Sequence, residues 1–317
     1  MPSSDPLVSI LTPVYNEAAY VRECIESVLA QTYRHWEHTI VDNASTDGTG
    51  EIAREYAAKD DRIRVIRNDE TLPVEANHSL AFEQVSGAAK YAKVVAGDDW
   101  IYPKCLEEMV RLAESHPRVA IVGAYSQSGI RVDPAEFPFE AEVVSGHELA
   151  RCYLARGPHL VGAPTPLLFR ADAVRARRPF YRSAKPHHDA DACLSLLAND
   201  DYGFVRQVLT YTRVREGSLT GKLNRYNVYM PAILELLIEH GPNFFEPAEL
   251  DARIRDQLTY YYNELGRSLV RRRGSDFWDY HRKRLAELGH PLSWARVAVN
   301  AILYAAEAVV TRTRKKV

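Results

Sequence analysis

Two adjacent aspartates, Asp98 and Asp99, follow directly after an apolar run at residues 91–95. The run has the length of a buried strand, so both carboxylates should lie at the carboxyl edge of a sheet. Ligands bind at that edge in open α/β sheets, and carboxylate oxygens suit a hard divalent cation that carries a phosphorylated ligand. The pair therefore predicts a metal-assisted phosphate site, and its alternative is a solvated turn before Pro103.

The elements that must position these residues alternate along the chain between strand-like and helical patterns. The expected strands cover residues 7–11, 36–41, 63–66, 91–95, 119–124, 165–170 and 204–214. The expected helices between them cover residues 21–29, 52–57, 77–85, 103–113, 145–153 and 192–198. This alternation predicts βαβ units, and hence an α/β fold whose mainly parallel sheet is flanked by helices.

After about residue 224 every pattern is helical, which predicts a domain at 1–224 and a helical appendage at 225–317. The helical stretches of the appendage cover residues 226–240, 247–272, 275–288 and 292–313. Residues 251–317 carry a net charge of +7, which leaves −9 for residues 1–250. The positive end favours a membrane or a phosphorylated carrier over nucleic acid, and its alternative is an ordinary solvated helical face.

The last helical stretch is apolar around most of its circumference. On a helical wheel its polar residues fall within about 60° of one another: Arg296, Asn300, Glu307, Thr311 and Arg314. Such a helix must bury its surface against the protein, a second copy of the chain or a membrane. The basic residues at 312–316 support peripheral membrane contact. Packing within the protein or in a homodimer is nevertheless favoured over it. The charges within the stretch disfavour a membrane-spanning helix.

Cysteine usage and the N-terminus bear on the compartment. Cys24, Cys105, Cys152 and Cys193 are widely separated, so neither a zinc site nor a disulfide framework is expected. The first residues lack a basic stretch followed by an apolar core, so no secretory signal is expected. A cytoplasmic location is therefore predicted. Peripheral attachment at the inner face of the plasma membrane is compatible with it.

Four segments follow one another in a characteristic order: Pro13-Val-Tyr-Asn-Glu17, Val41-Asp-Asn-Ala-Ser-Thr-Asp-Gly-Thr49, Gly97-Asp-Asp-Trp100 and His188-Asp-Ala-Asp191. Over residues 6–220 the chain resembles the family 2 glycosyltransferases of the GT-A fold. The resemblance implies a Rossmann-like domain with a nucleotide-sugar half at about 6–100 and an acceptor half at about 101–224. It implies inverting transfer from a nucleotide-diphosphate sugar, with UDP as the expected nucleotide. The implied acceptor is a hydroxyl of a saccharide or lipid-linked molecule in bacterial surface polysaccharide synthesis.

The resemblance also implies a nucleotide-binding set: Pro13, Tyr15, Glu17, Asp42, Asn77, Asp98 and Arg215. Tyr15 would form a stackable wall of the base pocket, and Asp42 would accept a hydrogen bond from the imide N–H of uracil. Arg215 stands where the family often places a histidine over the diphosphate, and its alternative is an exposed loop arginine.

The implied metal is Mn²⁺ or Mg²⁺, held by Asp98 and Asp99 against the diphosphate. The commonest family pattern is D-x-D-D, and Ala96 stands at its first acidic position. One potential ligand is therefore missing from the expected metal site.

The resemblance makes Asp189 the general base that removes the proton of the acceptor hydroxyl. His188 replaces the glutamate usual in the family, and could tune Asp189 or contact the acceptor. Asp191 is the fallback base, although capping a helix that starts at Ala192 is its favoured role. A metal cluster at residues 187–191 is disfavoured, because neighbouring side chains point in different directions.

Two other functions remain open. A polyprenyl-phosphate sugar synthase has a phosphate acceptor that needs no base, which would make Asp189 dispensable. A catalytically silent nucleotide-sugar-binding scaffold is the second, and the departures at Ala96 and His188 keep it open.

Overall fold

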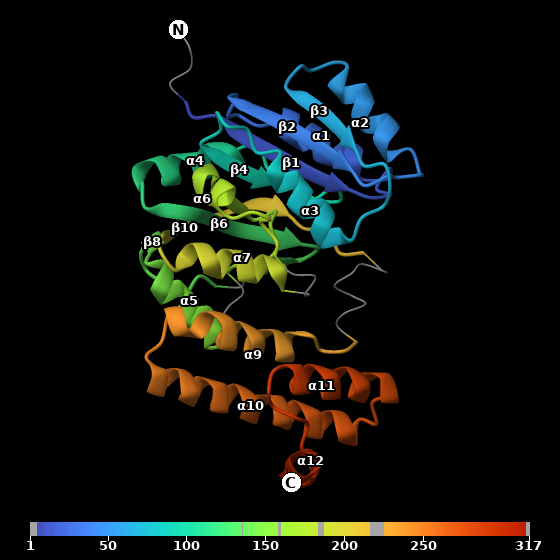
Figure 1. Ribbon diagram of the computed structural model, residues 1–317, viewed down its shortest axis with the longest axis vertical. Helices are drawn as coiled ribbons and strands as arrows, with labels where there is room; N and C mark the ends of the chain where they lie inside the picture. Colours follow the sequence, from blue (N-terminus) through green and yellow to red (C-terminus); the bar gives the residue numbers. More distant parts are fainter. Residues whose placement is uncertain (1–4, 135, 158–159, 183–186, 216–224, 315–317) are drawn as a thin grey trace. The chain divides into compact units, whose positions relative to one another are not determined.

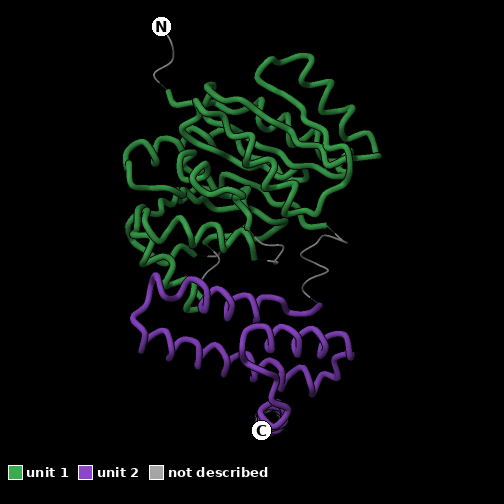
Figure 2. Tube along the Cα trace, viewed as in Figure 1, with its two compact units in different colours: residues 1–215 green, residues 216–317 purple. Residues whose placement is uncertain are grey.

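The computed structural model describes residues 5–134, 136–157, 160–182, 187–215 and 225–314, with backbone alone from 307 onward (Figure 1). The chain forms two compact units, residues 1–215 and 216–317 (Figure 2). Unit 1 contains a large sheet with helices on both faces, and unit 2 is helical.

The sheet of unit 1 is mixed but mainly parallel, as the sequence predicts. Its longer strands are β1 (Val8–Val14), β2 (Trp36–Asp42), β3 (Ile63–Arg67), β4 (Tyr91–Val94), β6 (Val119–Ser128), β9 (Leu167–Arg170) and β10 (Asp201–Tyr211). Three short strands complete it: β5 (Trp100–Ile101), β7 (Arg131–Asp133) and β8 (Val143–Val144). The strand order is β3-β2-β1-β4-β9-β6-β10-β5. Because β9 alone runs antiparallel between β4 and β6, strands β1 to β4, β6 and β10 share one direction.

Helices cover both faces of this sheet (Figure 1). They are α1 (Val21–Leu29), α2 (Thr49–Ala57), α3 (Val74–Glu83), α4 (Cys105–Ser115), α5 (Gly146–Leu154), α6 (Ala171–Ala176) and α7 (His188–Leu197). The apolar sides of α1, α2 and α4 share one core with alternate residues of the strands, such as Val8, Ile10 and Val14. On the other face α3 packs through Phe82 against Phe169 of β9. Because successive side chains of a strand point to opposite faces of the sheet, each strand contributes residues to the packing beneath both helical layers.

Several boundaries differ from the sequence expectation. Helix α7 begins at His188, four residues before Ala192, so the prediction that Asp191 caps this helix is wrong. His187 is the N-cap residue, and Asp191 lies in the first turn. Helix α3 begins at Val74 instead of residue 77. The unexpected elements β5, β7, β8 and α6 have two to six residues, too few to show a period in the sequence.

Unit 2 confirms the expected helical appendage. Its helices are α9 (Tyr229–His240), α10 (Pro247–Val270), α11 (Ser275–Glu287) and α12 (Trp294–Arg314). Their core gathers Leu234 of α9, Tyr261 of α10, Phe277 of α11 and Val297 of α12. Gly266 lets α10 and α12 approach closely, because a Cβ there would lie 2.7 Å from the backbone nitrogen of Ala301.

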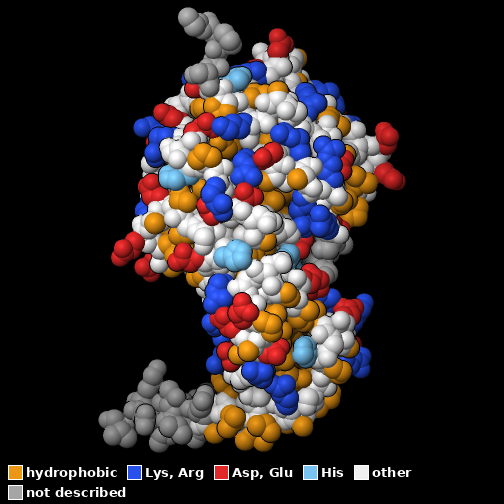
Figure 3. Space-filling view, turned by 60° about the vertical axis from the view of Figure 1, so that its left-hand side comes forward, with side chains coloured by type: hydrophobic (Ala, Val, Ile, Leu, Met, Phe, Trp, Pro, Cys, Tyr) orange, Lys and Arg blue, Asp and Glu red, His pale blue; other side chains and the backbone are white. Residues whose placement is uncertain are grey.

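Helix α12 leaves much of its apolar surface uncovered. Val297 and Ala301 are buried, whereas the side chains of Ile302 and Leu303 are 69% and 57% exposed. Figure 3 shows hydrophobic side chains gathered at the bottom of the view, where α12 lies. Over residues 294–306, whose side chains are described, packing within the protein therefore accounts for one side of this helix only. Among the described residues, no helix is long and apolar enough to cross a membrane.

Candidate active site

Four chain segments meet at one edge of the sheet because of strand direction. Strands β1, β4 and β10 run the same way, so the segments that follow them leave from the same edge. Strand β9 runs the opposite way, so the segment that precedes it arrives there. The side chains delivered in this way are Glu17 after β1, Asp98 and Asp99 after β4, Thr165 before β9, and Arg213 and Arg215 after β10.

Asp99 is buried, and both of its carboxylate oxygens are held. Thr165 Oγ1 donates to Oδ2 at 2.7 Å, and the backbone N–H of Arg213 donates to Oδ1 at 2.9 Å. Burial, together with the nearby charge of Asp98, raises the pKa of Asp99 to about 6, while these two hydrogen bonds oppose the rise. The carboxylate is thus fixed in direction and retains lone pairs for a further partner.

Asp98 is more accessible and is paired with a cation from the end of β10. The Nε of Arg215 lies 2.8 Å from Asp98 Oδ2, in an ion pair. Arg213 donates from Nε to the main-chain carbonyl of Asp98 at 2.9 Å and pairs with Glu23 of α1. The two arginines therefore tie the aspartate turn to the end of β10 by different groups.

Glu17 brings a third carboxylate to the aspartates. Its Oε1 accepts a hydrogen bond from Arg215 Nη2 at 3.1 Å, whereas its buried Oε2 has no hydrogen-bond partner among the described residues. Burial, and then the charge of Asp98, raises the pKa of Glu17 to about 8. The approach depends on Gly97, because a Cβ there would lie 2.0 Å from Glu17 Oε2 and 2.5 Å from Val14 Cγ1.

This donor set fits a divalent cation. Asp98 and Asp99 offer carboxylate oxygens, the ligand type preferred by Mg²⁺ and Mn²⁺, and Glu17 lies near enough for its pKa to respond to both of their charges. The Oε2 of Glu17 is a buried polar atom without a hydrogen-bond partner in the described part of the chain, and such an atom is costly unless an ion, a water or a proton satisfies it. The pattern D-x-D-D would have supplied an additional acid from position 96, so Asp98 and Asp99 are the acidic residues that this turn offers.

The residues expected to contact the base of the nucleotide lie at the ends of β1 and β2. Tyr15 is 48% exposed, so one face of its ring can meet a ligand. Asp42 is fully buried at the end of β2, where its Oδ2 pairs with Arg67 and its Oδ1 accepts from the Ser45 backbone N–H at 2.9 Å. Arg67 is directly opposite Asp42 in the strand register, a signal that only strand pairing reveals.

Pro13 and Asn77 complete the expected nucleotide set. Pro13 is buried within β1, one residue before the strand ends. Asn77 lies in the first turn of α3 and accepts a hydrogen bond from Asn68 Nδ2 at 3.0 Å. Asn68 in turn donates to Asn43, which follows β2. Asn77 thus belongs to an amide network that supports the segment after β2.

The expected general base, Asp189, lies in the first turn of α7. Asp189 has a side chain that is 24% exposed, and His188 Nε2 lies 3.5 Å from its Oδ1. The ring of His188 packs against Tyr181, with centroids 4.5 Å apart. Both residues are therefore held in unit 1 while Asp189 keeps access to solvent.

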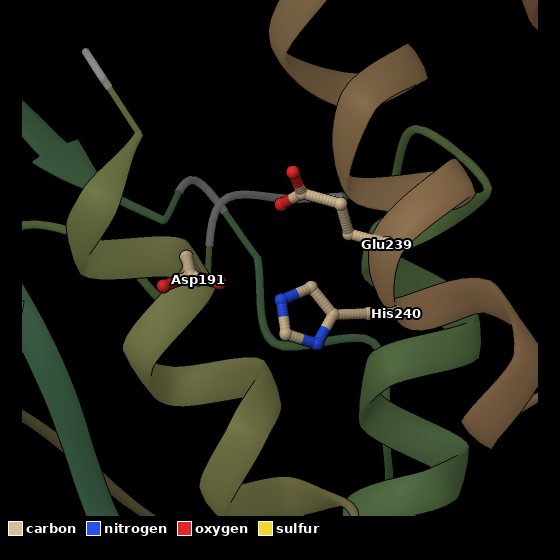
Figure 4. Close-up of side chains that lie close together, drawn as sticks. All are labelled: Asp191, Glu239 and His240. Atoms are coloured by element: carbon tan, nitrogen blue, oxygen red, sulfur yellow. The ribbon is translucent and has the colours of Figure 1, made fainter. Parts of the chain in front are cut away.

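Asp191 has a different environment from Asp189. Its carboxylate forms an ion pair with Arg177, whose side chain is only 6% exposed. Figure 4 shows Asp191 on α7, and Glu239 and His240 on α9. Because Glu239 and His240 belong to unit 2, we do not assign these three residues as a metal site. The ion pair favours a structural role for Asp191 over that of fallback base.

The family assignment rests on sequence similarity that covers most of unit 1. A family model described as Glycosyl transferase family 2 matches residues 9–175. The chain belongs to this family. A relative, EpsE of Bacillus subtilis (strain 168), is named as a candidate glycosyltransferase. It is 32% identical over 224 residues, which are 68% of this chain and 75% of EpsE. The resemblance drawn from the four sequence segments is thereby confirmed.

Solved structures show the fold of this family 2 glycosyltransferase to be GT-A. TarS of S. aureus (residues 1–349), in complex with UDP-GlcNAc, superposes with a TM-score of 0.67 at 17% identity, covering 89% of this chain and 80% of that one. The mannosyltransferase PcManGT of Pyrobaculum calidifontis, in complex with GDP-Man and Mn²⁺, gives a TM-score of 0.60 at 16% identity. That match covers 99% of this chain and 84% of PcManGT.

Sequence reasoning missed three members of the site in this glycosyltransferase. Thr165 and Arg213 hold Asp99, yet they lie 66 and 114 residues away from it in the chain. Arg67, which pairs with Asp42, was missed as well. The one available signal was that each lies at, or next to, an end of an expected strand.

Proposed function

We propose that this glycosyltransferase moves a sugar, with inversion, from a nucleotide-diphosphate donor to a hydroxyl group. UDP is the expected nucleotide, and the acceptor is a saccharide or lipid-linked molecule in bacterial surface polysaccharide synthesis. One observation carries the proposal: where β1, β4 and β10 end, Arg215 pairs with Glu17 and Asp98, and Asp99 follows Asp98 with its carboxylate held by Thr165 and the Arg213 backbone. Carboxylates for a cation and a guanidinium for phosphate oxygens are the groups that a sugar diphosphate requires.

The cation of this proposal is Mn²⁺ or Mg²⁺, with Asp98 and Asp99 as its ligands. When bound, it would neutralise the charge that develops on the departing nucleotide diphosphate. Thr165 and the Arg213 backbone keep Asp99 pointed in one direction, so the site needs little reorganisation. Tyr15 offers its exposed ring face to the base, and Asp42 stays the proposed partner of the uracil imide.

The proton of the acceptor hydroxyl goes to Asp189 in this mechanism. A hydroxyl becomes an effective nucleophile only when a base takes its proton, and a partly exposed carboxylate can serve. His188 lies beside Asp189 and Tyr181, which restricts how the carboxylate can turn. Asp189 is thus the proposed catalytic base and His188 the residue that positions it.

A donor screen tests the proposal as a whole. Nucleotide sugars are added with Mn²⁺, and the melting temperature and donor hydrolysis are recorded. A ligand at 100 times its Kd stabilises the folded chain by about 2.7 kcal/mol, so the correct donor should stand out. Loss of both signals in EDTA supports metal assistance. A catalytically silent scaffold would show the thermal shift without hydrolysis, and no shift with any donor would contradict the proposal.

The partner of α12 is the remaining part of the proposal. Its exposed apolar residues span about half of the helix circumference, as a wheel at 100° per residue shows: Trp294, Ala295, Ala298, Val299, Ile302, Leu303, Ala305 and Ala306. The sequence adds basic residues at 312–316. We propose that this face meets a second copy of the chain or an anionic membrane at the cytoplasmic side, where a lipid-linked acceptor would lie.

A further inference from the structure

Arg215 is shared between two carboxylates of the cation site. Its Nη2 lies 3.1 Å from Glu17 Oε1 and its Nε lies 2.8 Å from Asp98 Oδ2. The guanidinium is about one-third exposed, whereas both carboxylates are more buried than that. One side chain from the end of β10 therefore contacts carboxyl groups that are delivered after β1 and after β4.

Arg213 provides a contrast two residues earlier. Its side chain binds the main-chain carbonyl of Asp98 and the carboxylate of Glu23, outside the three carboxylates of the site. Its backbone N–H donates a hydrogen bond to Asp99. The Arg213 side chain thus stabilises the turn through the Asp98 carbonyl, whereas Arg215 pairs with the carboxylate of Asp98, a proposed ligand of the cation.

A divalent cation and Arg215 make competing demands on Asp98. A cation bound to a carboxylate oxygen lies within about 2.6 Å of it, which leaves little room for a guanidinium on the same oxygen. Two positive charges at such a distance also repel each other. Asp98 cannot be spared, because Ala96 removes the acid that the commonest family pattern places at that position.

We propose that Arg215 and the divalent cation are alternative counter-ions of Asp98, so that metal binding releases the Arg215 guanidinium toward the diphosphate. The inference deepens the proposed function and rests on its metal site. A guanidinium freed from Asp98 presents the planar fork of donors that binds phosphate oxygens in pairs. Arg215 would thereby oppose binding of the metal alone and favour binding of the metal together with the nucleotide.

The predicted signature is a pair of changes with opposite signs. In Arg215→Met, Mn²⁺ should bind about tenfold more tightly without nucleotide, because Asp98 no longer has a competing cation. In the same variant, UDP should bind about tenfold more weakly when Mn²⁺ is saturating, because the diphosphate loses a donor. If Arg215 only held the site in shape, its replacement would weaken both Mn²⁺ binding and UDP binding.

The experiment measures free Mn²⁺ by electron paramagnetic resonance in titrations of the full chain, and UDP binding by calorimetry. Arg206→Met is the control, since it removes the same charge from β10, where the guanidinium donates to the backbone carbonyls of Phe139 and Glu140 instead of to a carboxylate of the site. Its Mn²⁺ affinity should change by about twofold at most. Arg215→Lys keeps one charge but cannot bridge both carboxylates, so its Mn²⁺ affinity should lie between those of wild type and Arg215→Met.

Folding is followed in the same samples by thermal melting. Arg215→Met should melt at a lower temperature than wild type in EDTA, and Mn²⁺ should raise its melting temperature more than that of wild type. Unchanged or weaker Mn²⁺ binding in Arg215→Met overturns the inference. If wild-type transfer still requires Mn²⁺ in that case, the proposed function stands without it; if wild type binds no Mn²⁺ even with UDP, both fall.

Discussion

At the scale of single residues, Asp189 and Asp191 show how similar side chains in one helical turn acquire different roles. Asp191 is tied to the buried guanidinium of Arg177, which needs a negative partner to be tolerated there. Asp189 has a histidine at 3.5 Å and keeps access to solvent. Only the second environment leaves a carboxylate available for proton transfer.

Replacement of Asp189 by asparagine tests the proposed base with little change in shape. Turnover should fall by about 10²–10⁴-fold while donor affinity stays unchanged, because the amide cannot accept the proton. Single-turnover transfer and UDP binding measure the two effects. As a matched control, Asp191→Asn should destabilise the fold by about 3 kcal/mol, since Arg177 loses its buried partner. Retained turnover in Asp189→Asn would favour the polyprenyl-phosphate alternative.

The raised pKa of Glu17 predicts how stability depends on pH without a metal. The folded chain keeps the Glu17 proton up to about pH 8, whereas the unfolded chain releases it near 4.5. Unfolding therefore releases a proton between these values, and stability must fall as the pH rises through this window. Asp99 contributes with the same sign between 3.8 and about 6.

Urea unfolding in EDTA from pH 5 to 9 measures this slope. Wild type should lose stability on the order of a few kcal/mol across the window, and Glu17→Gln should remove most of that loss. The glutamine keeps the shape without the titrating group. An identical slope in wild type and variant would show that Glu17 is not the group responsible.

At the scale of elements, the site depends on how closely the segment after β4 approaches the segment after β1. Gly97 sits at this crossing, and the space for its missing side chain is taken by Glu17 and by Val14. The crossing explains why a small residue precedes the two aspartates. It also makes the position of Asp98 depend on the packing of β1.

Gly97→Ala should therefore damage both stability and the metal site. The added Cβ meets Val14, which is fixed in the core, so the segment must move at a cost of about 1–3 kcal/mol. Mn²⁺ affinity should fall in the same variant because Asp98 moves with the segment. Gly87→Ala is the control, since a Cβ there meets nothing within 4 Å. Equal melting temperatures for the two variants would contradict this account.

At the scale of the whole molecule, the two units differ in net charge as well as in secondary structure. The positive net charge lies in the C-terminal residues, beyond the glycosyltransferase unit. The same part of the chain carries the uncovered apolar side of α12. An apolar face beside basic residues is the composition expected of a surface that meets either another protein or an anionic membrane.

Serine replacements on α12 distinguish these partners. Ile302→Ser with Leu303→Ser should leave the melting temperature nearly unchanged, because both side chains are already exposed. The double replacement should abolish whichever association the wild-type chain shows. Dimerisation is measured by light scattering, and membrane binding by flotation with vesicles that contain phosphatidylglycerol. Val297→Ser, at a fully buried position, is the control that should destabilise unit 2. A wild-type chain that neither dimerises nor floats would refute both partners.

The sequence by itself determined the alternation of strands and helices, the helical C-terminal part and the placement of Asp98 and Asp99 at the end of a strand. Each of these follows from patterns within about ten neighbouring residues, which side-chain periodicity makes visible. It misplaced the start of α7 by four residues, because Asp189 and Asp191 carry side chains that are common at N-caps and that a helix also accepts in its first turn.

Only the tertiary structure decided which distant residues meet the aspartates. The antiparallel insertion of β9 brings Thr165 to Asp99, and the direction of β10 brings Arg215 to Asp98 and Glu17. Strand order and direction depend on the packing of the whole sheet, so no local pattern encodes these contacts. The sequence thus named Glu17, Asp98, Asp99 and Arg215 one by one, and the fold decided that Arg215 pairs with Glu17 and Asp98 and that Thr165 and Arg213 hold Asp99.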